Sequence, residues 1–454
     1  MNLVHNYEAE YIRKLIAPEG AAGLIKSGDT IAYGGFILSP IFTDGFIAKR
    51  VKEDKNFRNV KIMTQVYPGI CQAAMADPTR EQIYFCNAFF GPGDRFLHVN
   101  GLCDFVPTLF HEFPYYLMNG YFKPRIVYLR TTPLDKNGFF NFGISNAFMK
   151  ELCKKADLVV VETNSSVPYC YGGFDEALHI SEVDYIVESD NSPLLAPKPV
   201  ESTDADRMIA NLLIDEIHDG SCIQLGIGGM PNVLGSMLAK SGLKDLGIHT
   251  EMFIDAFVDL HEAGCVTNAR KKIYPGKSVY TFAFGSQRMY DFLDNNPSCA
   301  SYPVHYVNDP AIIAQIDDMV SINNAMEVDL YGQVSSESDK FRQVTGTGGQ
   351  LDFVFGAGRS NGGKSFICLT STYKDKEGNV KSRLVPTFAP GTITSVPRSM
   401  TNYVVTEYGV IQLKGKSTWE RADAIIDIAH PDFRDSLIAE AEKMNIWKKT
   451  NRIA

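Results

Sequence analysis

Two glycine-rich stretches, one in each half of the chain, follow the same plan. Residues 28–40 read GDTIAYGGFILSP, and residues 220–231 read GSCIQLGIGGMP. Each runs from a glycine through strand-forming residues into a glycine cluster and ends at Pro40 or Pro231. A strand that leads through a glycine turn into a helix is typical of α/β proteins. The two stretches therefore predict one α/β unit in each half.

Two further pairs of segments repeat in the same order. LDKNGFFNFGIS (134–145) is similar to VDLYGQVSS (328–336). ADLVVVETN (156–164) is similar to TNYVVTEYG (401–409), which places Glu162 opposite Glu407. A proline-rich stretch over 190–204 separates the halves, and proline disfavours helix around it. We expect two related domains, 1–198 and 199–454.

Strands and helices alternate along the chain. The patterns predict strands at 28–34, 59–64, 125–130, 157–162, 221–226 and 403–407, and helices at 8–16, 207–218, 232–240 and 419–429. Ser202 or Thr203 is available as the N-cap of the helix that leads into 207–218. Continuous apolar runs such as Leu158–Val161 suit strands that are buried on both faces of a parallel sheet. The expected fold class is α/β, with mainly parallel open sheets flanked by helices, which bind ligands at the carboxyl ends of their strands.

Composition excludes several classes of protein. The 454 residues carry 44 basic against 53 acidic side chains, a net charge of −9, which disfavours a nucleic-acid-binding groove. Apolar runs are far shorter than the ~20 residues of a membrane span, and the N-terminus has no apolar signal stretch, so no membrane partner is expected. Nine cysteines without a CxxC motif indicate buried reduced thiols and a cytoplasmic protein.

Gly226-Ile227-Gly228-Gly229-Met230 is the first candidate site. Glycines allow a ligand to approach the backbone closely, and successive amides can hold an anion or oxyanion. The alternative is a tight strand–helix turn without a ligand. Pro231 occupies the position where the dinucleotide fingerprint GxGxxG requires its third glycine, which disfavours a dinucleotide site.

Glu251, in His249-Thr250-Glu251-Met252, is the second candidate. It follows the glycine loop by about one strand–helix–strand unit, so the two are expected at the same sheet edge. With an ordinary pKa of about 4.3, its carboxylate is expected to be ionised and to act as a nucleophile toward acyl groups. From composition alone, a salt-bridged glutamate at a strand end is the favoured alternative.

A third glycine loop, Gly346–Gln350, is suited to bind a phosphate or amide through its backbone, or is a generic turn. The chain has neither HExxH nor GxSxG, and its histidines are widely spaced. Neither a metal site nor a Ser-His-Asp triad is therefore expected.

Several motifs in order resemble the acetyl-CoA hydrolase/transferase branch of the family I CoA-transferases, in particular the 4-hydroxybutyrate and butyrate CoA-transferases. They cover nearly the whole chain: KSGD (26–29), FVPTLFHEFP (105–114), LGIGGMPN (225–232), GIHTEM (247–252), YVNDPAIIAQ (306–315), GTGGQLDFVFGA (346–357), YVVTEYGV (403–410), LKGKS (413–417) and IAHPDFR (428–434).

The resemblance implies a ping-pong CoA transfer in which Glu251 forms an acyl anhydride and then a glutamyl-CoA thioester. It implies that CoA is a co-substrate, that no cofactor is permanently bound, and that acyl-CoA and small carboxylates are the partners. It assigns CoA contacts to Gly226, Ile227, Gly228, Gly229, Met230, Met326, Gly348, Gly349 and, less distinctively, Lys376. Amides of 226–229 are expected to stabilise the oxyanion. By analogy the chain forms a homodimer or homotetramer.

Two departures from the family pattern concern the acyl group. The family usually has Ser and Gly where this chain has Ile254 and Ala256, so these two residues are expected to line a narrower, more apolar acyl pocket. His111 and Glu112 are candidates for a polar substrate contact or for structural hydrogen bonding. Acetyl-CoA or succinyl-CoA is the expected donor; 4-hydroxybutyrate, butyrate or a dicarboxylate such as itaconate is the expected acceptor. An acyl-CoA hydrolase is the alternative activity, and a non-enzymatic CoA-binding protein is a third.

Overall fold

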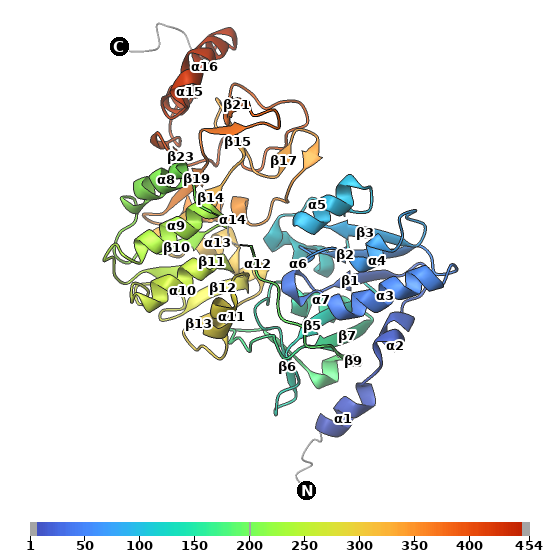
Figure 1. The fold of residues 1–454 in the computed structure, drawn as a ribbon. Coiled ribbons are helices and arrows are strands. Elements are labelled where there is room, and N and C mark those ends of the chain that lie inside the picture. Colours follow the sequence, from blue (N-terminus) through green and yellow to red (C-terminus); the bar gives the residue numbers. More distant parts are fainter. Residues whose placement is uncertain (1–6, 199–200, 447–454) are drawn as a thin grey trace. The chain divides into compact units, whose positions relative to one another are not determined.

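The computed structural model describes residues 7–198 and 201–446, and the chain forms two compact units (Figure 1). The first comprises the described residues up to Pro197 together with Val279–Val307. The second comprises the described residues of Lys198–Ser278 and those from Asn308 onward. The expected division into domains after residue 198 stays a prediction. The compact units depart from it because Val279–Val307 belongs to the first unit.

A seven-stranded, wholly parallel sheet forms the centre of the first unit. All six residues of its strand β5 are buried, as expected where helices cover both faces of a sheet. The strand order is β4 (Asp104–Phe105), β3 (Ile83–Asn87), β2 (Val60–Thr64), β1 (Thr30–Tyr33), β5 (Ile126–Thr131), β7 (Leu158–Thr163) and β9 (Tyr185–Glu188). Its helices are α1 (Tyr7–Lys14), α2 (Pro18–Gly23), α3 (Ile41–Glu53), α4 (Gln72–Met75), α5 (Pro92–Val99), α6 (Phe113–Met118) and α7 (Met149–Lys155).

The second unit has a sheet of related order. Its own strands run β11 (Gly247–Phe253), β10 (Cys222–Leu225), β14 (Met319–Asn324), β19 (Lys364–Cys368), β23 (Tyr403–Thr406) and β24 (Gly409–Gln412). Neighbours are parallel up to β23, and β24 is antiparallel. Its helices are α8 (Asp204–Ile214), α9 (Gly229–Leu238), α10 (Asp255–Glu262), α13 (Pro310–Ile313), α14 (Gln350–Ala357), α15 (Thr418–Asp427) and α16 (Pro431–Lys443). Helices α8, α9 and α10 lie side by side (Figure 1).

The segment Val279–Val307 returns to the first unit. It contains most of β12 (Ser278–Ala283), then α11 (Gln287–Leu293), β13 (Cys299–Ser301) and α12 (Val304–Val307). Its amides bond to carbonyls of the N-terminal part: Ala283 to Ile144 at 2.7 Å, Ser301 to Tyr171 at 2.8 Å and Val304 to Ala147 at 2.7 Å. These bonds fix the segment within the first unit.

Short pieces complete the architecture. The first unit adds the antiparallel pair β6 (Phe139–Asn141) and β8 (Ala177–His179) and the 3-10 helices η1 (Phe36–Leu38), η2 (Phe110–Glu112) and η3 (Ile180–Glu182). The second adds the three-stranded β16 (Val334–Ser335), β15 (Glu327–Asp329) and β22 (Leu384–Val385), and the pairs β17 (Ser338–Asp339) with β18 (Arg342–Gln343) and β20 (Thr372–Lys374) with β21 (Val380–Ser382).

All six predicted strands are confirmed, and so are the four predicted helices, with ends that shift by a few residues. Thr203 is the N-cap of α8 and accepts a hydrogen bond from the amide of Asp206. All nine cysteines are free and buried, as predicted. Within the described ranges, no helix has both the length and the apolar character that crossing a membrane requires.

One sequence echo is wrong. The first echo pairs β1 with β10, and the two strands have equivalent neighbours: β1 lies between β2 and β5, and β10 lies between β11 and β14. The third echo pairs β7 with β23, but β7 lies two places from β1, as β19 lies two places from β10. Glu162 and Glu407 are therefore not equivalent. The short VV run that suggested the match is common to many buried parallel strands.

Candidate active site

Glu251 lies on β11 of the second unit, beside the central strand β10. The other six residues of β11 are buried, and Glu251 keeps some accessible surface. A buried apolar strand therefore carries one carboxylate that a ligand can reach, at the sheet edge where ligands bind in open α/β folds.

Two groups hold the Glu251 carboxylate. Asn308, which precedes α13, donates from Nδ2 to Oε2 at 2.6 Å. The backbone amide of Gly349, the N-cap of α14, also donates to the carboxylate. A Cβ at Gly349 would overlap both the Glu251 carboxylate and the Asn308 amide, so this position requires glycine. Side chain and backbone together fix the orientation of the carboxylate.

The surroundings of Glu251 raise its pKa to about 8. Burial is the main cause, and the negative charge of Asp352 adds to it, while the bonds from Asn308 and Gly349 act in the opposite direction. At pH 7 only about a tenth of the enzyme therefore carries the ionised form. This corrects the expectation, drawn from the ordinary pKa of glutamate, that the carboxylate is fully ionised at neutral pH.

The glycine loop follows β10 and begins helix α9. Gly228, the N-cap of α9, has φ +128°, a conformation that favours glycine. Gly229 and Met230 form the first turn of α9, where amide protons have no acceptor within the helix. Gly226 instead donates its N–H to the carbonyl of Ile322 at 2.9 Å. The amide of Gly226 is therefore already bonded, and it is not available for the oxyanion role expected of residues 226–229.

Asn324, at the end of β14, joins this loop to α14. Its Nδ2 donates to the carbonyl of Ile227 at 3.0 Å, and its own carbonyl accepts from Nε2 of Gln350 at 2.9 Å. Gln350 is the first residue of α14 and follows Gly349. The two glycine loops, 120 residues apart in the chain, are thus linked within the second unit through one asparagine.

A cavity of about 300 Å³ opens beside the first loop. Three residues to which the sequence analysis assigned CoA contacts line it: Gly229, Met230 and Met326. Arg383 also lines it and donates to the carbonyl of Met326 at 3.0 Å and to Oγ1 of Thr370 at 3.2 Å. Apolar residues such as Ile209 and Leu369 form part of its wall, and the cavity has one cationic side chain, Arg383, and one acidic side chain, Asp206.

The remaining predicted residues lie elsewhere. Lys376 is exposed on the turn between β20 and β21. His111 and Glu112 belong to the first unit, where Nε2 of His111 lies 3.1 Å from Oε1 of Glu112. Gly348 has φ +55° and directly precedes Gly349.

Ile254 and Ala256 are 5% and 2% exposed at the start of α10. A Cβ on Gly235 of α9 would lie 2.4 Å from the methyl group of Ala256, closer than two such atoms can approach, so Ala256 packs directly against that glycine. This contact joins two helices. The acyl-pocket role of Ile254 and Ala256 stays a prediction.

Sequence reasoning missed Asn308, Asp352 and Asn324. Asn308 and Asp352 stand within the quoted motifs YVNDPAIIAQ and GTGGQLDFVFGA, yet neither received a role. No local pattern links Asn308 to a glutamate 57 positions earlier. In the sequence, Asn308 followed by Asp309 looks like an ordinary helix start. Only the fold shows that Asn308 contacts Glu251.

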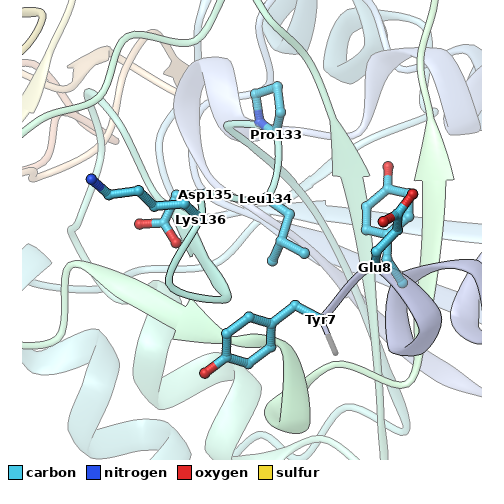
Figure 2. A pocket seen from close by; sticks show the side chains of 7 residues that line it. Tyr7, Glu8, Pro133, Leu134, Asp135 and Lys136 are labelled. Atoms are coloured by element: carbon cyan, nitrogen blue, oxygen red, sulfur yellow. The ribbon is translucent and has the colours of Figure 1, made fainter. Parts of the chain in front are cut away.

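A larger hollow of about 400 Å³ lies on the first unit, between the start of α1 and the loop 133–136. Figure 2 shows the side chain of Leu134 beside the ring of Tyr7, with Glu8, Asp135 and Lys136 around them. None of the predicted site residues lines this hollow. Glu251 and its partners lie in the second unit.

Comparison with known proteins identifies the family of this chain. Residues 1–196 match the acetyl-CoA hydrolase/transferase N-terminal domain, and residues 285–441 match the C-terminal domain of the same family. A butyryl-CoA:acetate CoA-transferase of Anaerostipes caccae is 45% identical over 98% of this chain and all of its own. A 4-hydroxybutyrate coenzyme A transferase of Clostridium kluyveri is 37% identical over 96% of this chain and 99% of its own.

Solved structures are similar as well. RipA from Yersinia pestis has a TM-score of 0.89 at 35% identity and covers 98% of this chain and all of its own. A 4-hydroxybutyrate CoA-transferase from Porphyromonas gingivalis has a TM-score of 0.79 at 31% identity, over 97% of this chain and all of its own. Acetyl-CoA hydrolases are more distant, at 24% identity for the protein of Candida glabrata, over 94% of this chain and 88% of its own. The chain therefore belongs to the acetyl-CoA hydrolase/transferase family and is an enzyme of the CoA-transferase class.

Proposed function

We propose that the enzyme moves CoA from an acyl-CoA donor to a short-chain carboxylate by a ping-pong reaction through Glu251. The observation that carries the proposal is the Glu251 carboxylate, held by Asn308 and Gly349 in buried surroundings. A desolvated carboxylate is more basic and so a better nucleophile than one in water. Two fixed donors orient it before the substrate arrives.

The reaction has two symmetrical halves. The ionised Glu251 attacks the thioester carbonyl of the donor, which gives a mixed acyl anhydride and CoA thiolate. The thiolate attacks the glutamyl carbonyl of the anhydride, releases the first carboxylate and leaves a glutamyl-CoA thioester. The incoming carboxylate reverses these steps and leaves as the new acyl-CoA, so the reaction consumes no water and no net proton.

The site is suited to the charges that develop. Each step passes through a tetrahedral oxyanion, and amides of the first turn of α9 at Gly229 and Met230 are available as donors. One such donor typically contributes ~10²–10³ in rate. CoA is expected as co-substrate in the cavity at Gly229, Met230 and Met326, where the cationic Arg383 suits an anionic ligand. Contacts from Gly226, Ile227, Gly348 and Lys376 stay part of the proposal.

For the acceptor, the names of the relatives favour butyrate, acetate and 4-hydroxybutyrate. A small dicarboxylate such as itaconate stays an alternative that rests on the sequence departures at Ile254 and Ala256. Acetyl-CoA or succinyl-CoA is the proposed donor. We further propose a cytoplasmic homo-oligomer, for which nine free buried cysteines and family analogy are the grounds.

Acyl-CoA hydrolysis on the same scaffold is the alternative, because water can also resolve the thioester. The test is CoA release and acyl exchange with acetyl-CoA, with and without butyrate, 4-hydroxybutyrate, succinate or itaconate. Transfer predicts parallel lines in double-reciprocal plots and new acyl-CoA in proportion to the acceptor. Free CoA released at one rate, whatever the carboxylate, would establish hydrolysis instead.

A further inference from the structure

The amide group of Asn308 lies between two carboxylates. Its Nδ2 is 2.6 Å from Oε2 of Glu251 and 3.4 Å from Oδ2 of Asp352. Asn308 is fully buried and Asp352 is 1% exposed. The Oδ1 atom of Asn308 is buried and, among the described residues, has no hydrogen-bond partner. The side chain thus leaves its acceptor unused in order to place its nitrogen between the two acids.

Only one orientation of this amide suits two acceptors. The NH2 group supplies two protons, one toward each carboxylate, whereas a flipped amide would place its oxygen against them. Glu251 alone would not enforce the orientation at all times. When Glu251 is protonated, its OH can donate to a flipped Oδ1. Asp352 removes that choice, because a flipped oxygen would then face its carboxylate.

The backbone brings Asp352 and Gly349 to the site together. Gly349 is the N-cap of α14, and Asp352 stands in the first turn of the same helix. An anionic side chain is stabilised in the first turn of a helix by the helix dipole. One helix start therefore provides both the amide that binds Glu251 and the carboxylate that faces Asn308.

We propose that Asp352 is a positioning residue of the Glu251 site: it fixes the amide of Asn308 with Nδ2 toward Glu251, whether or not Glu251 is protonated. The proposal rests on the proposed function of Glu251 as nucleophile. Its consequence is that each turnover begins with the donor already aligned on the carboxylate, so no amide rotation is needed after the proton leaves.

A double-mutant cycle tests this, because a residue that acts through another loses its effect when that other residue is removed. Asp352→Leu is made in the wild type and in Asn308→Ala, and kcat and KM are measured for transfer from butyryl-CoA to acetate at pH 9.5. At this pH Glu251, with a pKa of about 8, is ionised with or without the charge of Asp352, so the cycle reports on position and not on ionisation. We expect kcat to fall at least ~10-fold in the wild-type background, since a misplaced group costs up to about 10²-fold. In Asn308→Ala the same change should alter kcat less than about twofold.

Asp352→Asn is the matched variant, since it keeps an acceptor and loses only the charge. It should cost less than Asp352→Leu and should move the pH profile of kcat/KM to lower pH, because the charge of Asp352 raises the pKa of Glu251. If Asp352→Leu does not fold by circular dichroism, Asp352→Ala, which also removes the acceptor and adds no bulk, takes its place in the cycle. Equal losses in both backgrounds, or a change in KM alone, would overturn it.

The failure of this proposal is distinguishable from failure of the proposed function. Covalent trapping of CoA on residue 251 of the wild-type enzyme reports on the nucleophile alone. Trapping together with an additive cycle would leave Glu251 as nucleophile and remove the positioning role of Asp352. Absence of trapping in the active wild type would remove the foundation of both.

Discussion

The carboxyl group of Glu251 sets the pH dependence of the reaction, because the attacking species is the ionised form. Its pKa is about 8 in the free enzyme. Below that value kcat/KM should fall about tenfold for each unit of pH, and above it kcat/KM should level off. Initial rates at low butyryl-CoA between pH 5.5 and 9.5 measure this. A flat profile from pH 6 upward would show that Glu251 ionises at its ordinary pKa.

The raised pKa of Glu251 should also make the free energy of unfolding depend on pH, because ionising this residue costs the folded protein free energy. Glutamate in the unfolded chain ionises near its model value of 4.5, whereas folded Glu251 resists ionisation up to about pH 8. Ionisation therefore favours unfolding progressively from pH 4.5 to 8, and the full cost remains above pH 8. Glu251→Gln removes this cost.

The free energy of unfolding of Glu251→Gln should thus match the wild type below pH 4.5 and exceed it above pH 8, by a few kcal/mol at most. Urea unfolding at pH 4 and pH 8.5 provides the comparison. A variant that is no more stable than the wild type at pH 8.5 would show that ionisation of Glu251 does not cost the folded protein free energy.

At the scale of single elements, glycines in the two loops that lead into α9 and α14 should respond differently to substitution by alanine. A Cβ on Gly226 would have its nearest neighbours at 3.6 Å, ordinary contact distance, so the fold itself tolerates Gly226→Ala. If CoA approaches this loop closely, the variant should raise KM for acyl-CoA without lowering the melting temperature. Gly349→Ala should instead lower kcat by ~10²-fold or more, because its methyl group displaces the Glu251 carboxylate.

Gly23→Ala is the matched control for both, since a Cβ there meets no atom within 4 Å and the backbone is not left-handed. Steady-state kinetics and thermal unfolding of the three variants separate ligand contact from packing. An unchanged KM in Gly226→Ala would argue that CoA does not touch the backbone at that position.

A buried ion pair joins β5, β7 and α3 in the first unit. Nε of Arg130 lies 3.2 Å from Oε1 of Glu162, and both side chains are at most 2% exposed. Glu162 also accepts the amide of Thr43 in the first turn of α3 at 2.8 Å. Glu162→Leu leaves the buried cation unpaired and should destabilise the protein by about 3–5 kcal/mol.

Urea unfolding of Glu162→Leu and of the double variant Arg130→Met/Glu162→Leu checks this. The double variant should regain a large part of the loss, since two apolar groups replace the pair without an unpaired charge. If the double variant were as unstable as the single one, the cost would come from packing or from the lost α3 contact.

The sequence was sufficient for the elements whose signals are local. Apolar runs, glycine turns and a Thr203 cap predicted strands and helices, and family motifs pointed to Glu251. The partners of Glu251 were not predictable, because Asn308 precedes α13, Asp352 lies in the first turn of α14, and the proximity of both to β11 depends on strand order. The raised pKa was missed for the same reason, since burial is a property of the assembled sheet and not of the motif HTEM.

At the scale of the whole molecule, the chain leaves the first unit at Pro197 and returns to it at Val279–Val307. One cut in the linker therefore cannot separate the units. A protease site inserted between Pro197 and Lys198 should yield two fragments that still elute together in gel filtration, held by the bonds of residues 283, 301 and 304 to the N-terminal part. Fragments that separate without denaturant would contradict this account of the segment.

The acceptor ranking also belongs to the whole molecule. Since Ala256 packs against Gly235, Ala256→Gly should lower stability by about 1 kcal/mol, which thermal unfolding measures. If Ile254 and Ala256 line the acyl pocket, Ile254→Ser/Ala256→Gly should change the order of preferred carboxylates in the acceptor panel. An unchanged order would remove these two positions from the acyl pocket.

A ping-pong transfer through Glu251 requires that CoA becomes covalently attached to this residue. The direct measurement incubates the enzyme with butyryl-CoA, reduces it with borohydride and determines the mass of the peptide that contains residue 251. We expect a peptide in which the carboxyl group has become an alcohol, with one oxygen lost and two hydrogens gained, and no such change in Glu251→Gln or without acyl-CoA. An unmodified Glu251 peptide from an enzyme that still transfers CoA would exclude Glu251 as the nucleophile.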